Sequence, residues 1–355
     1  MEAGSLTCMG QKARVKHRNE PYFLTFWGQA AMGRAMSDPI SSQNRAFVFP
    51  GQGSQALGMG KDLAESFPAA KHVFQEINEA LGQDLSGLMW GEDLDALTLT
   101  ENAQPALMAV SMAAVRALEA GGYDLASQGA FVAGHSLGEY SALAAAGVLS
   151  LGDCAKLLKL RGQSMQAAVP VGQGAMAAVL GLTTDQIETI AQAAADQTGQ
   201  VCALANDNAP GQGVMSGAAA AIDVAIEQAS AAGAKRALKL NVSAPFHCAL
   251  MAPAAQEMAA ALAKTDMGAF ALPLIANVSA SAYADPAQTA DLLVQQVTGR
   301  VRWTESMAYA ADQGVTQLVE IGAGKVLSGL AKRIDSRLSA VQAGSADALK
   351  ALLDS

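Results

Sequence analysis

Short apolar runs alternate with longer stretches of helical spacing through the first part of the chain. The runs Ala46–Phe49 and Ala130–Ala133 are uniformly apolar, and the first ends at a Pro-Gly pair, so both predict buried strands. Apolar residues recur every three or four positions over about 60–81, 103–120 and 137–146, which predicts helices. This alternation is typical of a parallel sheet with helices on both faces.

Around residue 169 the pattern changes. A β-α-β-β-α-β order follows, with strands over 175–180, 201–205, 213–216 and 237–242 and helices over 184–195 and 219–232. This order matches the ferredoxin-like motif, so we expect a small inserted α+β subdomain. Beyond it, Leu274-Ile275 and 317–321 resume the strand pattern, and 326–334 predicts a closing helix.

These elements predict an α/β fold with a hydrolase-like core and an inserted ferredoxin-like subdomain. The first 40 residues hold five basic and three acidic residues, whereas the whole chain holds 23 and 32. A start at Met36 would give a more ordinary protein, and a transit peptide is the weaker alternative. The expected parts are an extension (1–43), a large catalytic subdomain (44–168 and 241–340), a small subdomain (169–240) and a C-terminal tail (341–355).

Composition and charge exclude several classes of protein. A hydrophobic fraction of 51% with 15% charged residues fits a folded domain with a sizeable core. The net charge of −9 argues against a nucleic-acid-binding surface, and no apolar run is long enough for a membrane helix. The cysteines lie outside metal-binding spacings and predict a reduced, cytoplasmic protein; they are Cys8, Cys154, Cys202 and Cys248.

An acidic protein partner would need a local basic patch on this acidic chain. There are two candidate clusters, and the alternative for each, favoured when the cluster is taken alone, is solvated charge on a helix face. They are Lys235, Arg236 and Lys239, and Lys332, Arg333 and Arg337.

The segment Gly134-His135-Ser136-Leu137-Gly138 fits the pattern G-x-S-x-G and lies between a predicted strand and a predicted helix, as that motif requires. Side chains at the two glycine positions would clash with the neighbouring strand or helix. The turn lifts the Ser136 hydroxyl out of the sheet, and the Leu137 N–H points to where an oxyanion would form. We expect Ser136 to be a nucleophile, the alternative being a structural turn.

A serine nucleophile needs a base, and the chain has four histidines. Three are unsuitable, because they lie in the extension, on an ordinary surface helix or pointing away from the serine: His17, His72 and His135. His247, in a proline-kinked loop after a predicted strand, remains as the base, the alternative being a buried structural histidine. Asp285, Asp291 or a backbone carbonyl could orient its imidazole.

The loop after the first strand formally matches a dinucleotide-binding pattern at Gly51–Ala56. A long helical region follows, however, and no second strand ending in an acidic residue appears about 20 residues further on. We expect this loop instead to present a backbone N–H as a second oxyanion donor. Arg161 lies on a mostly apolar helix, where burial is costly without a partner, so taken alone it is a charge at the helix edge.

Six motifs, in order over about residues 44–340, resemble the bacterial malonyl-CoA:acyl-carrier-protein transacylases, including the acyltransferase domains of fatty-acid and polyketide synthases. Ala323 departs from the pattern, where the family usually has proline, and the extension lies outside it. The motifs are Phe47–Gln55, Gln104–Leu107, Gly134–Tyr140, Leu160–Gly162, Ala244–His247 and Glu320–Leu327.

The resemblance implies that Ser136 is the acylated nucleophile and His247 its base. The N–H groups of Gln52 and Leu137 would form the oxyanion hole, and Arg161 would bind the free carboxylate of malonate through two charge-assisted hydrogen bonds. Further implied roles are substrate binding by Gln104 and Phe246, and orientation of the histidine by the backbone carbonyl of Gln296.

The implied reaction transfers malonyl from malonyl-CoA to the phosphopantetheine thiol of acyl carrier protein, by a ping-pong route that supplies fatty-acid synthesis. No metal or redox cofactor is implied, and we expect a monomer. An esterase or lipase is the nearest rival; it predicts the chain order Ser, acid, His and no need for Arg161. A non-catalytic module that docks carrier protein is another, and it predicts that Ser136→Ala leaves binding intact.

Overall fold

The structure, a computed structural model, describes Met1 and residues 44–354. Residues from 44 onward belong to one compact unit, Ile40–Ser355. The expectations for the extension, including His17 and Cys8, lie outside the described residues.

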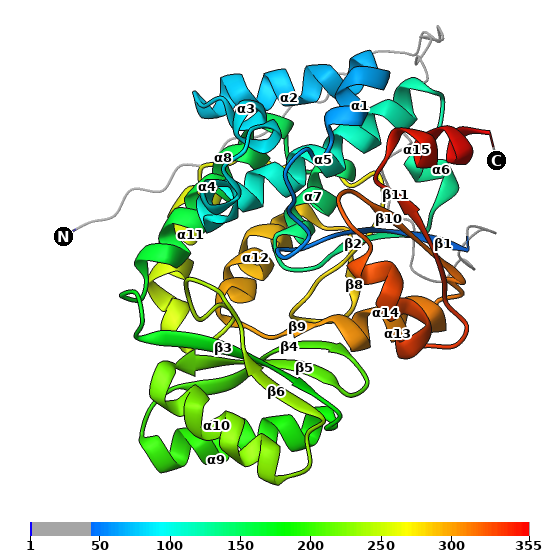
Figure 1. The fold of residues 1–355 in the computed structure, drawn as a ribbon. Coiled ribbons are helices and arrows are strands. Elements are labelled where there is room, and N and C mark those ends of the chain that lie inside the picture. The colour runs from blue at the N-terminus through cyan, green and yellow to red at the C-terminus, as the bar shows by residue number, and fades with distance from the viewer. Residues whose placement is uncertain (2–43, 355) are drawn as a thin grey trace, which may run out of the picture. The chain divides into compact units, whose positions relative to one another are not determined.

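The first sheet has six strands and is parallel except at one edge (Figure 1). Phe47 on the central strand lies opposite both Val132 and Val319, and four of that strand's five residues are buried. Burial on both faces is usual for parallel strands covered by helices. In spatial order the strands are β11 (Ser339–Ala343), β10 (Gln317–Ile321), β1 (Arg45–Phe49), β2 (Phe131–Gly134), β7 (Leu274–Ile275) and β8 (Ala282–Tyr283), with β8 antiparallel to β7.

Most of the helices that precede the second sheet pack against α5, and most residues of α5 are buried. The helix expected over 60–81 is two helices, because Phe67 is extended and Pro68 starts the second one. The helices are α1 (Lys61–Ser66), α2 (Pro68–Leu81), α3 (Leu85–Trp90), α4 (Leu94–Thr98), α5 (Thr100–Ala120), α6 (Leu125–Gln128), α7 (Gly138–Ala145) and α8 (Leu151–Ala167).

The second sheet is built mainly from the inserted segment. Its first four strands are antiparallel and follow the predicted β-α-β-β-α-β order, with α9 (Thr184–Thr198) and α10 (Ala219–Ala231) side by side on one face (Figure 1). A fifth strand from later in the chain pairs in parallel with β4 and was not expected. In spatial order the strands are β6 (Arg236–Lys239), β3 (Gly174–Leu180), β5 (Gln212–Ala218), β4 (Cys202–Ala209) and β9 (Val301–Arg302).

The predicted fold class, an α/β core with a mostly parallel sheet and a second, antiparallel-rich sheet, is confirmed. The chain after residue 340, expected as a tail, instead completes β11 and forms α15. β11 is mostly exposed, so it lacks the apolar run that marks β1 and β2. The later helices are η1 (Ala249–Met251), α11 (Ala252–Leu262), η2 (Pro286–Gln288), α12 (Thr289–Thr298), α13 (Trp303–Asp312), α14 (Val326–Ile334) and α15 (Ala346–Leu353).

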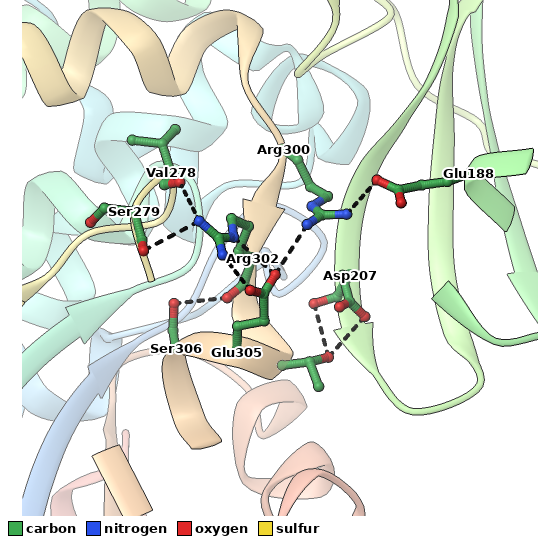
Figure 2. Close-up of polar contacts among 9 residues, drawn as sticks. Glu188, Asp207, Val278, Ser279, Arg300, Arg302, Glu305 and Ser306 are labelled. Atoms are coloured by element: carbon green, nitrogen blue, oxygen red, sulfur yellow. Dashed lines mark hydrogen bonds and ion pairs between the residues drawn. The ribbon is translucent and has the colours of Figure 1, made fainter. Parts of the chain in front are cut away.

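A cluster of charged side chains joins the two sheets beside β9 (Figure 2). Arg300 pairs with Glu188 of α9 at 2.6 Å and with Glu305 of α13 at 3.1 Å. Arg302 also pairs with Glu305 and donates to the carbonyl of Val278 at 3.1 Å. The segment that follows α12 is therefore tied both to the small sheet and to the loop after β7.

Candidate active site

The sharp turn between β2 and α7 needs glycine at both flanks. A Cβ on Gly134 would lie 1.9 Å from the backbone of Gly138, and one on Gly138 would lie 2.3 Å from the carbonyl oxygen of Phe49. Neither backbone can yield at such distances, so the predicted clash is confirmed. The turn holds Ser136 at a φ of 54°, a left-handed conformation that non-glycine residues rarely adopt.

Ser136 and His247 meet although they are 111 positions apart in the chain. The Oγ of Ser136 lies 2.7 Å from the Nε2 of His247. His247 also has a positive φ, of 58°, so two of the three non-glycine residues with positive φ among the described residues form this pair. Strained backbone at a functional site is common where the surrounding structure fixes it.

The other ring nitrogen of His247 faces backbone carbonyls. Its Nδ1 lies 2.9 Å from the oxygen of Gln296 and 3.1 Å from that of Gly299. Carbonyl oxygens only accept, so Nδ1 carries the hydrogen and Nε2 is left to accept the Ser136 proton. Of the groups that could orient the imidazole, the backbone carbonyls of Gln296 and Gly299 are the ones that contact it. Asp285 caps η2, and Asp291 is exposed.

Burial decides the charge of this imidazole. Removal from water, reinforced by the positive charge of Arg161, lowers the pKa of His247 to about 3. His247 is therefore neutral across the physiological range and available as a base.

Arg161 is buried next to the nucleophile, not at a helix edge. Only 2% of the residue is exposed, and its Nη2 donates to the Ser136 Oγ at 3.1 Å. Its Nη1 donates to the Oε1 of Gln104 at 2.8 Å. The guanidinium lies 5.7 Å from the centre of the Tyr140 ring. These neighbours leave a positive charge beside the serine hydroxyl, where it can attract an anionic group of a substrate.

Gln296 connects all three of these residues, and sequence reasoning gave it only a backbone role. Its side-chain Oε1 accepts from Arg161 Nη2 at 2.9 Å, and its Nε2 donates to the backbone oxygen of Ser136 at 2.9 Å. Its own backbone oxygen accepts from His247. One fully buried residue thus contacts the nucleophile, the imidazole and the guanidinium.

Two further buried residues complete this network and were missed. Glu139 accepts from Gln296 Nε2 at 2.9 Å and from the Asn277 N–H at 3.0 Å. Asn277 in turn accepts from the Ser136 N–H and donates to the Gly134 carbonyl, at 2.8 and 2.7 Å. The sequence could have indicated Glu139, because it lies within the Gly134–Tyr140 motif, whereas Asn277 lies in none of the motifs.

The remaining predicted residues lie around this network. The Gln52 loop packs on the turn, since a Cβ on Gly51 would come within 2.7 Å of the His135 carbonyl oxygen. Leu137 is the N-cap residue immediately before α7, so its N–H lies at the positive end of that helix. The side chain of Phe246 takes no part in this hydrogen-bond network and packs in the main hydrophobic core.

His135 points away from Ser136, as expected. Its Nε2 lies 2.8 Å from the Oδ1 of Asn208, on the small sheet's β4–β5 hairpin, and its ring packs on Trp303. Cys248, beside the imidazole in sequence, is buried, and burial raises the pKa of its thiol. Neither residue is placed to act on the serine. In the described part of the chain, no helix has the length and apolar character needed to span a bilayer.

The chain matches the model of the acyl transferase domain family over residues 46–346. It is 45% identical over 296 residues to the malonyl CoA-acyl carrier protein transacylase of Bacillus subtilis (strain 168), covering 83% of this chain and 92% of that protein. An acyl-carrier-protein-S-malonyltransferase structure from Bartonella henselae is 53% identical with a TM-score of 0.85, covering 88% of this chain and 98% of that one. A malonyl-transacylase solved in complex with a type II PKS acyl-carrier protein is 42% identical with a TM-score of 0.84, covering 88% and 99%. The chain therefore belongs to the malonyl CoA-acyl carrier protein transacylase family of acyl transferases.

Proposed function

We propose that this protein transfers a malonyl group from malonyl-CoA to the phosphopantetheine thiol of acyl carrier protein, for fatty-acid synthesis. The observation that carries the proposal is the position of the Arg161 guanidinium, 3.1 Å from a serine hydroxyl that also contacts an imidazole. A cation at that point suits an acyl group that ends in a carboxylate. Family membership and the complex described above support the choice of carrier protein as acceptor.

In the first half-reaction, Ser136 Oγ attacks the thioester carbon while its proton moves to His247 Nε2. The new C–O bond forms, the C–S bond breaks, and the proton passes from His247 to the departing coenzyme A sulfur. N–H groups of Gln52 and Leu137 stabilise the oxyanion; losing one such donor typically costs about 10²–10³ in rate. The product is malonyl-Ser136.

In the second half-reaction, the carrier thiol gives its proton to His247 and attacks the ester carbon. The C–S bond forms, the C–O bond breaks, and the proton returns to Ser136. Arg161 holds the malonyl carboxylate throughout, with Gln104 holding Arg161 and Phe246 shaping the apolar wall. An acetyl group would leave the guanidinium without its anionic partner, which disfavours acetyl transfer.

We further propose that the protein is a cytoplasmic monomer and that the divisions at about residues 43, 168 and 240 are domain boundaries. The β-α-β-β-α-β order of the second sheet supports the inner two boundaries.

The test is a transfer assay with malonyl-CoA and phosphopantetheinylated carrier protein. We expect malonyl-carrier protein to form faster than free malonate, and we expect Ser136→Ala to abolish formation of malonyl-carrier protein. Release of malonate without carrier product would favour an esterase, and retained transfer in Ser136→Ala would exclude this mechanism.

A further inference from the structure

The buried charge of Arg161 has only neutral direct partners. They are two side-chain amides, a hydroxyl and an aromatic ring. Across the described residues, Arg161 takes part in no ion pair with a carboxylate. A buried guanidinium without a counter-charge is costly, and burial accordingly lowers the pKa of Arg161.

The carboxylate that acts on this charge is that of Glu139, which is separated from the guanidinium by the side-chain amide of Gln296. Glu139 is fully buried, and its Oε2 accepts from Gln296 Nε2, while Gln296 Oε1 accepts from Arg161. The amide cannot be reversed, because its nitrogen faces two acceptors and its oxygen faces a donor. The negative charge of Glu139 thus fixes the orientation of Gln296 and, through it, that of the guanidinium.

Keeping this carboxylate one amide away leaves guanidinium hydrogens available to a ligand. A direct ion pair would occupy the donors that an incoming carboxylate needs. The second carboxylate oxygen of Glu139, Oε1, is buried and has no hydrogen-bond partner in the structure. Such an oxygen is a natural site for a proton.

The ionisable groups that interact with Glu139 come from three elements. Burial raises the pKa of Glu139 to about 7, although the hydrogen bonds from Gln296 and Asn277 and the positive charge of Arg161 on α8 favour the ionised form. Tyr140 on the same helix and Tyr283 on β8 have pKa values raised by burial, so neither phenol ionises near neutrality. Glu139 is therefore the group of this cluster that can change charge near pH 7.

We propose that Glu139 determines the specificity of the site for acyl groups that carry a free carboxylate: it is the counter-charge of Arg161 in the free enzyme, and it takes up a proton from solvent when such an acyl group binds. The inference rests on the proposed binding of malonyl by Arg161. Two carboxylates beside one guanidinium leave a buried excess negative charge, which protonation of Glu139 removes. Preference for malonyl over a neutral acyl group therefore weakens as Glu139 ionises.

The test compares acylation by malonyl-CoA and acetyl-CoA in the full-length protein between pH 6 and 9, at substrate concentrations below saturation. The malonyl-to-acetyl rate ratio cancels effects of the shared coenzyme A and of His247. In the wild type we expect the ratio to fall about three- to tenfold as pH rises through 7. A flat wild-type ratio overturns the proposal without the need for any variant.

Glu139→Gln keeps the side-chain shape and an acceptor for Gln296 and removes the charge. We expect its ratio to be independent of pH, at the wild-type low-pH value. A merely structural glutamate would slow both substrates alike and leave the ratio's pH dependence in place, which also overturns the proposal. Glu320→Gln is the matched control, because Glu320 is equally buried and accepts from the α14 N–H groups of Leu327 and Ser328; we expect it to keep the wild-type profile.

Arg161→Ala in the same assay separates this inference from the proposed function. An unchanged malonyl preference in Arg161→Ala contradicts the role of Arg161 itself. Loss of the preference in Arg161→Ala, together with a pH-dependent ratio in Glu139→Gln, contradicts only the role of Glu139.

Discussion

The guanidinium of Arg161 and the hydroxyl of Ser136 are 3.1 Å apart, although they come from α8 and from the turn before α7. In most serine hydrolase-like sites the nucleophile needs an imidazole and oxyanion donors, and no adjacent cation. Under the proposed function the cation restricts which acyl groups fit, because a neutral acyl chain can form no charge-assisted hydrogen bond with it. In that proposal the pair links the chemistry of acyl transfer to the choice of acyl group.

Arg161→Ala should lower acylation by malonyl-CoA about 100-fold, because a buried charge-assisted contact is lost, worth about 3 kcal/mol. Acylation by acetyl-CoA should change much less, since acetyl has no carboxylate to bind. Single-turnover acylation with the two substrates measures both effects. Lys156→Ala, an exposed position on the same helix, is the control. Equal losses with both substrates would contradict a carboxylate-binding role.

Gln296→Ala should destabilise the protein and slow malonyl acylation. The change leaves the Ser136 carbonyl, Glu139 and Arg161 each short of a buried partner, which costs about 2–3 kcal/mol in the free energy of unfolding. Some activity should remain, because the backbone carbonyl that orients His247 is kept. Urea unfolding and single-turnover acylation measure the two effects. The neighbouring Gln295→Ala is the control, since Gln295 is exposed; equal stability of the two variants would argue against the side-chain role.

Acetyl-CoA acylation should be nearly independent of pH between 8 and 5. The base must be neutral, and the neutral form of His247 is lost only as pH falls through its pKa of about 3. An ordinary histidine would begin to lose activity below its usual pKa of about 6.5. Rate constants measured over this range decide between the two. A tenfold fall per pH unit below 6 would show that His247 is not buried in the neutral form.

The ion pair of Glu188 and Arg300 should contribute less than about 1 kcal/mol to stability, because both side chains are partly exposed to solvent. A double-mutant cycle with Glu188→Ala and Arg300→Ala, measured by urea unfolding, gives the coupling free energy. The coupling should decrease in high salt, because screening weakens exposed pairs. A larger, salt-independent coupling would mean that this junction (Figure 2) is buried in solution.

The sequence predicted elements well where apolar periodicity was strong. β10 and α14 have the predicted bounds, and β1 and β2 differ by one or two residues. β9 was missed because two residues show no period, and β11 because most of its residues are exposed. β11 is a strand because it pairs with β10, not because its own composition favours one.

For the site, motifs could indicate residue types but not contacts. The motifs led to Ser136 and His247, whose proximity the sequence could only suggest. The side-chain role of Gln296 depends on contacts across 135 and 160 positions, to Arg161 and to the Ser136 carbonyl. Long-range contacts of this kind leave no local pattern. The same holds for Asn277, whose side-chain amide forms hydrogen bonds on both sides of the turn only in the folded chain.

The central claim is tested most directly by intact-mass analysis after mixing the protein with malonyl-CoA, followed by peptide mapping of the adduct. We predict that the protein gains the mass of one malonyl group, located on Ser136, and loses it when phosphopantetheinylated carrier protein is added. We predict no adduct in Ser136→Ala. A malonyl adduct on another residue, or an undiminished adduct in Ser136→Ala, would contradict the account.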